Sequence, residues 1–248
     1  MRWILETESG SRAGVEEAFA LAAALNLRGV LLPLPAFAAE PAELTEAEGD
    51  RLRRLASGTG VTVAGLTDVM AGAEHRLVGG DTSRAAALAR LQAAIRLCTE
   101  LGMRLLCLEL PAWETLCGKL RPEQARTLAA EVLRRCGPLA ESRRVTLCVS
   151  GGESAAAVKF VQAVDHPNIR LACDGAALKQ LAKPIRDVRL VRARPGDDPR
   201  RLGRLLGALG YSQWVSLCPG SGADMAAAQA WLKACRDAAD STSSATEA

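Results

Sequence analysis

Residues 86–110 read AALARLQAAIRLCTELGMRLLCLEL and combine the two patterns that recur along the whole chain. In residues 86–101, apolar side chains recur three and four positions apart, which is typical of the buried face of a helix. Gly102 then supplies a helix stop, and Met103–Leu110 is a nearly continuous apolar run. Such a run is typical of a parallel strand that is covered on both faces. The stretch therefore predicts a helix that leads directly into a buried strand.

The same alternation of helical stretches and apolar runs extends over most of the chain. The clearest other helical stretches are Pro122–Arg135, Pro199–Leu209 and Ala223–Ala238. The predicted strands are Arg2–Thr7, Arg28–Leu34, Val61–Thr67, Met103–Leu110, Arg144–Ser150, Ile169–Asp174, Asp187–Ala193 and Gln213–Cys218. Strict alternation favours a parallel sheet with right-handed crossovers, and eight such units in about 240 residues have the size of a closed barrel. We therefore predict an α/β fold, a single (β/α)8 TIM barrel over residues 1–238, followed by a disordered polar C-terminal tail at 239–248.

Composition and the absence of certain motifs exclude several other classes of protein. A hydrophobic share of 49% among 248 residues is ample for a packed core, and a net charge of +3 is too small to indicate nucleic acid or an anionic membrane as a partner. No apolar run reaches the roughly 18 residues of a membrane span, and the start of the chain lacks the features of a signal peptide. The phosphate-binding patterns GxGxxG and GxxxxGK[ST] are absent. The chain is therefore expected to be cytoplasmic, with no nucleic-acid or membrane partner.

The eight cysteines form no Cys-x-x-Cys pair, and none lies in the first 97 residues. Disulfide frameworks belong to small secreted domains, and a structural zinc site needs paired thiolates at short spacing. We therefore expect reduced thiols that are mostly buried among apolar side chains.

Polar residues stand at the ends of the predicted strands, and in a TIM barrel the carboxyl ends of all strands form the rim where active sites lie. Asp174 ends the run IRLACD, and Glu109 lies near the end of LCLEL, so these two carboxylates are the candidate catalytic acid or base. The candidate substrate-binding residues on the same rim are Glu6, His75, Ser150, Arg192, Arg194 and Cys218.

Asp174 and the two arginines of the following strand allow more than one interpretation. Asp174 could serve the site, cap a helix that begins near Ala176, or pair with a neighbouring arginine. Arg192 and Arg194 are two positions apart, so both side chains point to the same side of the strand. They could hold a carboxylate or phosphate of a ligand, or Arg192 could form an internal ion pair with Asp174.

Two further residue types at the rim are weaker candidates. Cys218 could be a nucleophile only with a base or a cation beside it. The chain has two histidines. His166 precedes a predicted strand and is expected at the opposite end of the barrel, whereas His75 follows a strand and lies on the side of the site.

Four segments resemble those of a known group of barrels. They are Asn26–Val30 (NLRGV), Ala94–Gly102 (AIRLCTELG), His166–Asp174 (HPNIRLACD) and Leu206–Leu217 (LGALGYSQWVSL). On these segments the chain resembles the xylose isomerase-like TIM-barrel superfamily, which includes sugar-phosphate isomerases and epimerases, inosose dehydratases and endonuclease IV. The resemblance extends over nearly the whole chain and implies the same barrel fold.

The resemblance also implies a divalent metal, because active members hold one with a Glu after the fifth strand, an Asp after the sixth, a His near the seventh and a Glu after the eighth. In this chain those positions are Ser150, Asp174, Arg192 and Cys218, so only the aspartate is retained. Arg192 places a permanent positive charge close to where the metal would bind. We therefore expect no metal ligands and no cofactor.

Three functions remain open from the sequence. The first is a sugar-binding or polyol-binding pseudoenzyme that has lost the metal site. The second is a metal-independent sugar isomerase or epimerase, with Asp174 or Glu109 as base and Arg192 or Arg194 as a clamp for an anionic group. The third is a non-catalytic assembly scaffold. The expected partner in the first two cases is a small anionic or polyol-like molecule.

Overall fold

Eight parallel strands close into a barrel in the computed structural model, which describes residues 1–7, 12–110, 119–151, 154–181, 185–194, 196–218 and 225–246. Each strand pairs with the next, and β8 pairs with β1. The strands are β1 (Arg2–Glu6), β2 (Gly29–Pro33), β3 (Thr62–Thr67), β4 (Leu105–Glu109), β5 (Thr146–Ser150), β6 (Ile169–Asp174), β7 (Val188–Ala193) and β8 (Trp214–Leu217). The predicted (β/α)8 barrel is therefore confirmed, and β6 has the bounds expected from the sequence.

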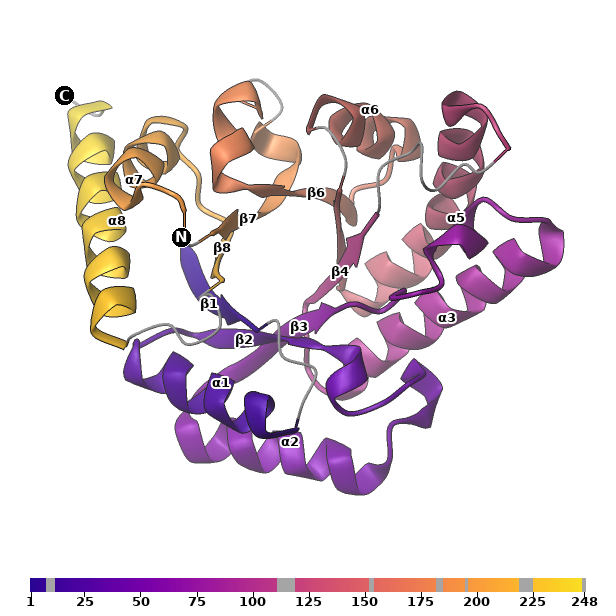
Figure 1. The fold of residues 1–248 in the computed structure, drawn as a ribbon, viewed down its shortest axis with the longest axis horizontal. Helices are drawn as coiled ribbons and strands as arrows, with labels where there is room; N and C mark the ends of the chain where they lie inside the picture. Colours follow the sequence, from indigo (N-terminus) through magenta and orange to yellow (C-terminus); the bar gives the residue numbers. More distant parts are fainter. Residues whose placement is uncertain are drawn as a thin grey trace.

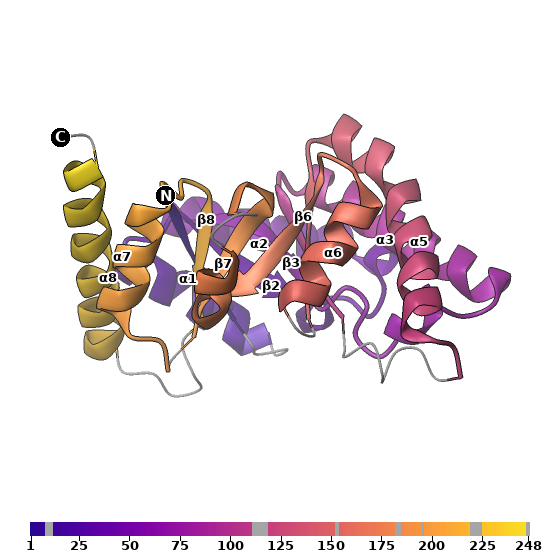
Figure 2. The same ribbon diagram turned by 90° about the horizontal axis from the view of Figure 1, so that it is seen from above.

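The helices surround the ring of strands (Figure 1), and the view from above shows them along its outer side (Figure 2). The α-helices of the described residues are α1 (Arg12–Ala24), α2 (Glu46–Thr59), α3 (Asp81–Glu100), α5 (Pro122–Arg143), α6 (Ser154–Val164), α7 (Pro199–Ala208) and α8 (Met225–Thr246). Short 3-10 helices are η1 (Leu34–Ala36), η2 (Pro41–Glu43), η3 (Glu74–Leu77), η4 (Gly175–Leu181) and η5 (Ile185–Asp187). Among the described residues between β6 and β7, η4 and η5 stand where regular alternation predicts an α-helix. None of the described helices is both long and apolar enough to cross a membrane.

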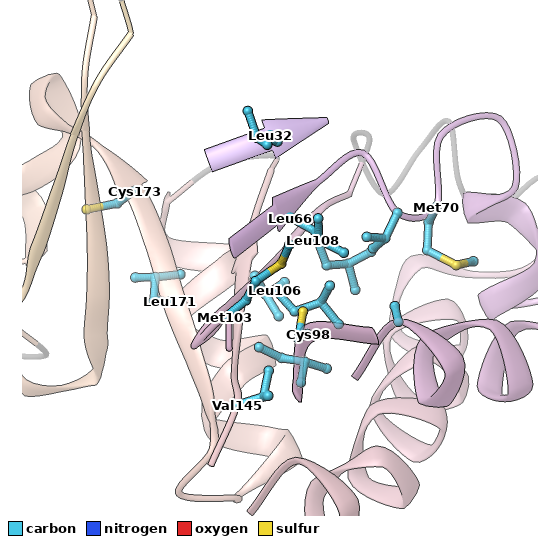
Figure 3. Packing of buried hydrophobic residues seen from close by; sticks show 14 of the residues in the cluster. Leu32, Leu66, Met70, Cys98, Met103, Leu106, Leu108, Val145, Leu171 and Cys173 are labelled. Carbon is cyan, nitrogen blue, oxygen red and sulfur yellow. The ribbon is translucent and has the colours of Figure 1, made fainter. Parts of the chain in front are cut away.

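The barrel has a small apolar core inside the strands and a larger one between the strands and the helices. The inner core is formed by Ile4, Leu31, Ala64, Leu105, Cys107, Cys148, Ala172, Leu190 and Trp214. Figure 3 shows part of the outer core, where Leu66, Leu106 and Leu108 pack close to Cys98 of α3. The seven cysteines of the described residues are buried and free, as the sequence predicts. The inner core is apolar, so the polar side chains that face the barrel interior lie at its two ends.

The final helix differs from the prediction. Helix α8 continues beyond Ala238 to Thr246, into the stretch predicted to be a polar tail from residue 239. Two glycines of α7 let α8 approach closely. A Cβ atom on Gly203 would lie 2.1 Å from the carbonyl oxygen of Cys235, and one on Gly207 would lie 2.4 Å from that of Ala239. The low helix propensity of the serines and threonines is therefore outweighed by packing of the preceding turn.

His166 lies at the amino-terminal end of the barrel, as expected from its place before β6. Its Nδ1 accepts a hydrogen bond from the backbone N–H of Asn168 at 3.1 Å. The ring packs against Gly137 of α5, where a Cβ atom would lie 2.4 Å from Cδ2 of the imidazole. His166 thus has a structural role remote from the carboxyl ends of the strands.

Candidate functional site

The carboxyl ends of the strands carry a cluster of charged and polar side chains. Strand pairing places Asp174 beside Arg192, Arg192 beside Ser216, and Glu109 beside Ser150. Alternation along each strand directs these residues to the barrel interior, two positions above the inner apolar core. The candidate residues at the ends of β1, β4, β5, β6, β7 and β8 are therefore gathered at one end of the barrel, which we call the mouth.

Arg192 is the central residue of the mouth and is only 2% exposed. Its Nε lies 3.1 Å from Oε1 and 3.2 Å from Oε2 of Glu6. Its Nη1 donates a hydrogen bond to Oγ of Ser150 at 2.9 Å and lies 3.6 Å from Oε2 of Glu109. Burial by itself lowers the pKa of Arg192, but the negative charge of Glu6 and of further neighbours more than offsets this effect, so the pKa is raised. The guanidinium therefore stays charged while it joins three strands.

Glu6 is the main partner of Arg192 and is itself buried. Besides Arg192, its Oε2 accepts hydrogen bonds from Oγ of Ser216 at 2.7 Å and from Sγ of Cys218 at 3.4 Å. A carboxylate has about four acceptor sites, and these three donors occupy most of them. The Glu6 carboxylate therefore holds Arg192 in place within the protein. Its role in substrate binding stays a prediction.

The expected ion pair between Arg192 and Asp174 is not the one that forms. Nε of Arg194 lies 3.1 Å from Oδ1 of Asp174, while the backbone N–H of Arg194 donates to Oδ2 of Asp197 at 2.8 Å. The Asp174 side chain is 51% exposed and the Arg194 side chain 35% exposed. This second ion pair is therefore open to solvent, in contrast to the buried pair of Arg192 and Glu6.

A pocket of about 210 Å³ lies over this end of the barrel. Its charged and polar lining consists of Glu109, Ser150, Asp174, Arg192 and Arg194. Pockets for drug-sized ligands are larger, about 300–1,000 Å³. The pocket therefore suits a small, hydrophilic molecule.

Cys218 directly follows β8 and is 1% exposed. Burial raises the pKa of its thiol, and the negative charge of Glu6 raises it further. A protonated thiol is a weak hydrogen-bond donor and a poor nucleophile. Cys218 therefore acts as a partner of Glu6 and does not present a nucleophile to the mouth.

The two remaining candidate site residues are Glu109 and His75. Glu109 ends β4 and has a side chain that is 59% exposed, with its carboxylate near Arg192. His75 lies in η3, after β3 and hence on the side of the mouth, but its side chain is outside the described residues.

Ser216 and Asp68 are not among the site residues predicted from the sequence, although Asp68 stands at a predicted strand end. Ser216 is fully buried and joins Glu6 to the wall of β8. It lies two positions before Cys218, so strand alternation could have placed both on the inner face. Asp68 directly follows β3 and has a left-handed backbone with φ of 56°. Its pKa is raised, first by desolvation and then by the negative charge of Glu6.

Asp68→Asn is expected to raise Tm at neutral pH. An acid with a raised pKa in the folded chain binds more protons there, so stability falls as pH rises from the unfolded pKa through the folded one. Asparagine removes this effect, keeps an oxygen for the hydroxyl of Thr67 and tolerates the left-handed backbone. Thermal unfolding measured across pH should show a gain that shrinks as pH is lowered towards about 4. An unchanged or lower Tm of the variant at neutral pH contradicts this view of Asp68.

Among the described residues, no group of three or more histidine, cysteine, aspartate or glutamate side chains is arranged to hold a metal ion. The acidic side chains of the mouth are instead joined to Arg192 and Arg194.

A known protein family matches most of this chain by sequence. Residues 19–181 match the family described as the xylose isomerase-like TIM barrel. The chain belongs to this family. The match covers well over half of the sequence and includes strands β2 to β6.

Several solved structures resemble this one along nearly their whole length. D-psicose 3-epimerase from Clostridium cellulolyticum H10 has a TM-score of 0.73 at 17% identity, with 96% of this chain and 99% of that chain covered. The 3-keto-D-glucoside 4-epimerase from E. coli has a TM-score of 0.73 at 13% identity, with the same coverage of 96% and 99%. A xylose isomerase domain protein from Alicyclobacillus acidocaldarius has a TM-score of 0.70 at 17% identity, covering 97% and 98%. At such low identity the likeness establishes the fold alone. No curated protein matches the chain significantly by sequence.

Proposed function

We propose that this barrel binds a small sugar or polyol-like molecule at its mouth, and that the guanidinium of Arg192 takes the place of the divalent metal of the family. The observation that carries the proposal is the position of Arg192. It is buried at the centre of the mouth and contacts carboxylates from β1 and β4 and a hydroxyl from β5. The fixed positive charge of Arg192 thus holds polar side chains from separate strands together, as a bound metal ion would.

The donor set around Arg192 does not fit a divalent cation. Such a cation needs several free carboxylate, imidazole or thiolate donors. Asp174 is paired with Arg194, and Glu6 already accepts hydrogen bonds from three side chains. A metal would also have to bind beside the permanent positive charge of Arg192. We therefore assign no metal-assisted step to this site.

The open part of the mouth has the chemistry that a hydroxylated ligand requires. Asp174 and Glu109 supply acceptors, and Arg194 supplies donors in a fork that also suits a carboxylate or phosphate. Solved relatives of similar fold are described as sugar epimerases, which supports a sugar as the kind of ligand. With its carboxylates paired to arginines, the mouth favours binding over proton transfer, so we propose a pseudoenzyme.

A metal-independent isomerase or epimerase is the second candidate, and one observation favours it. Glu109 and Asp174 both line the pocket, and each is more than half exposed. Either carboxylate could approach a carbon-bound proton of a bound sugar. Arg192 or Arg194 would then stabilise the negative charge that develops on the adjacent oxygen.

The test is binding of ketoses, polyols and sugar phosphates, measured by isothermal titration calorimetry. We expect at least one of these molecules to bind, and Asp174→Asn to weaken it about tenfold or more, since hydrogen bonds to charged groups contribute about 1.5–3 kcal/mol. The matched control is Asp50→Asn, which breaks an exposed ion pair with Arg53 on α2 and should leave binding unchanged.

Nuclear magnetic resonance spectra of the bound sugar, followed over hours, separate the two candidates. An unchanged sugar supports the pseudoenzyme. Epimer formation that is lost in Asp174→Asn or Glu109→Gln supports the second candidate. Failure of every molecule to bind contradicts both and favours the scaffold.

A further inference from the structure

Arginines are concentrated at the opposite end of the barrel, where the strands begin. They occur within two residues of the start of six strands, namely Arg2, Arg28, Arg104, Arg144, Arg170 and Arg189 for β1, β2, β4, β5, β6 and β7. Arg170 pairs with Asp187, and Arg189 donates to the side chain of Gln213. Within the described part of the chain, no ion pair joins Arg2 or Arg28 to a carboxylate. The amino-terminal end therefore carries positive charge that its own acidic side chains do not neutralise.

A large pocket opens within this basic end. It has a volume of about 930 Å³ and lies between the starts of β1, β2, β3 and β8 and the outer helix α8. Three arginines line it, Arg2, Arg28 and Arg236, against a single acidic side chain, Asp240. A volume near the upper end of the range for ligand pockets is enough for an organic molecule with several phosphoryl groups.

Two of these arginines are held in place by tryptophans. The guanidinium carbon of Arg2 lies 5.2 Å from the ring centroid of Trp214, and that of Arg236 lies 5.7 Å from that of Trp3. Trp3 is itself fixed by an edge contact with Trp231 of α8. A guanidinium that stacks on a ring keeps its in-plane N–H groups for hydrogen bonds, because the ring contacts only its face.

A further donor in the pocket lining has no partner. Trp214 lines the pocket and is 9% exposed, and its indole Nε1 is buried without a hydrogen-bond acceptor among the described residues. Leaving such a donor unpaired costs free energy in the folded chain. Because this nitrogen has no exposed surface, it is not open to a ligand in the pocket.

From this arrangement we propose that the amino-terminal pocket is a second binding site, for a small organic phosphate with two or more phosphoryl groups. Arg2, Arg28 and Arg236 neutralise the phosphoryl oxygens. Lone phosphate would leave most of the volume empty, whereas a di- or triphosphate with an organic group fills it. The site lies across the inner apolar core from the mouth, so it is distinct from the proposed sugar pocket.

Calorimetric titration with pyrophosphate and with adenosine triphosphate at low salt tests the proposal, with adenosine as the uncharged control probe. We expect both phosphates to bind at one site and adenosine not to bind. The triple variant Arg2→Gln/Arg28→Gln/Arg236→Gln should bind at least about a hundredfold more weakly. A charge-matched variant with Arg53→Gln, Arg54→Gln and Arg204→Gln, on α2 and α7, should bind as the unmodified chain does.

Several results would overturn the proposal. These are no binding of either phosphate in the low millimolar range, equal binding by the triple variant, or binding that Arg194→Gln removes, which assigns the anion to the mouth. Binding of long polyanions alone would assign the basic end to a macromolecule instead. Should the triple variant not fold, Arg28→Gln decides the matter, because Arg28 is exposed and outside the core.

Discussion

Arg192→Met is expected to lower the free energy of unfolding by about 3–5 kcal/mol, as measured by urea denaturation. The side chain is almost completely buried, and its removal leaves the carboxylate of Glu6 buried beside only Ser216 and Cys218. A buried charge that loses its partner keeps its desolvation cost without the compensating attraction. The loss should therefore exceed what the missing packing of the longer side chain explains.

The double variant Glu6→Leu/Arg192→Met separates the ion pair from simple packing. Replacing both partners of a buried pair by apolar side chains is often neutral or stabilising. We expect the double variant to be more stable than Arg192→Met alone, with a large coupling between the two substitutions. The exposed pair of Arg53 and Asp50 provides the control, where Arg53→Met should change stability by less than about 1 kcal/mol. Full stability of Arg192→Met, or simple addition of the two single effects, would contradict the proposed role.

Restoring the ligands of the family is expected to convert the mouth into a metal site. In the triple variant Ser150→Glu/Arg192→His/Cys218→Glu, the three substitutions join Asp174 at the ends of four consecutive strands. The variant loses a central cation and gains two carboxylates, so its metal-free form should be strongly destabilised by repulsion among acidic groups. Manganese should then raise its Tm, since a ligand at a hundred times its Kd adds about 2.7 kcal/mol.

Two control variants test whether manganese binds at the restored site. Adding Asp174→Asn should abolish the gain in Tm, because it removes a carboxylate ligand. Ser150→Glu/Cys218→Glu with Arg192 retained should show no gain, because the guanidinium still occupies the centre. A response to manganese that persists in either control would mean that the metal binds elsewhere.

The sequence predicts the barrel because each strand is a compact apolar run. Such a run directly indicates a strand that is buried on both faces. For β6, the predicted bounds Ile169 and Asp174 are also those of the structure. The end of α8 was missed since it depends on contact with α7 at Gly203 and Gly207. That contact joins segments far apart in the sequence, which local propensity does not register.

The sequence predicts which residues lie at the rim of the barrel, but it does not predict which of them pair with one another. Strand alternation correctly brings Arg192 and Asp174 to one end, yet Arg192 turns to Glu6, which is 186 positions away and adjacent only because β8 closes onto β1. Asp174 pairs with Arg194 instead. Such choices depend on side-chain rotamers and on competing partners. A single sequence carries no direct signal for either.

The most direct test of the central claim, that Arg192 takes the place of the family's metal, is the metal content of the purified chain. Elemental mass spectrometry should be combined with thermal unfolding in the presence of Mn²⁺, Zn²⁺ and Mg²⁺. We predict no stoichiometric metal and no rise in Tm with any of the three ions. One metal ion per chain, lost in Asp174→Ala, would contradict it and would return this barrel to the metal-dependent members of its family.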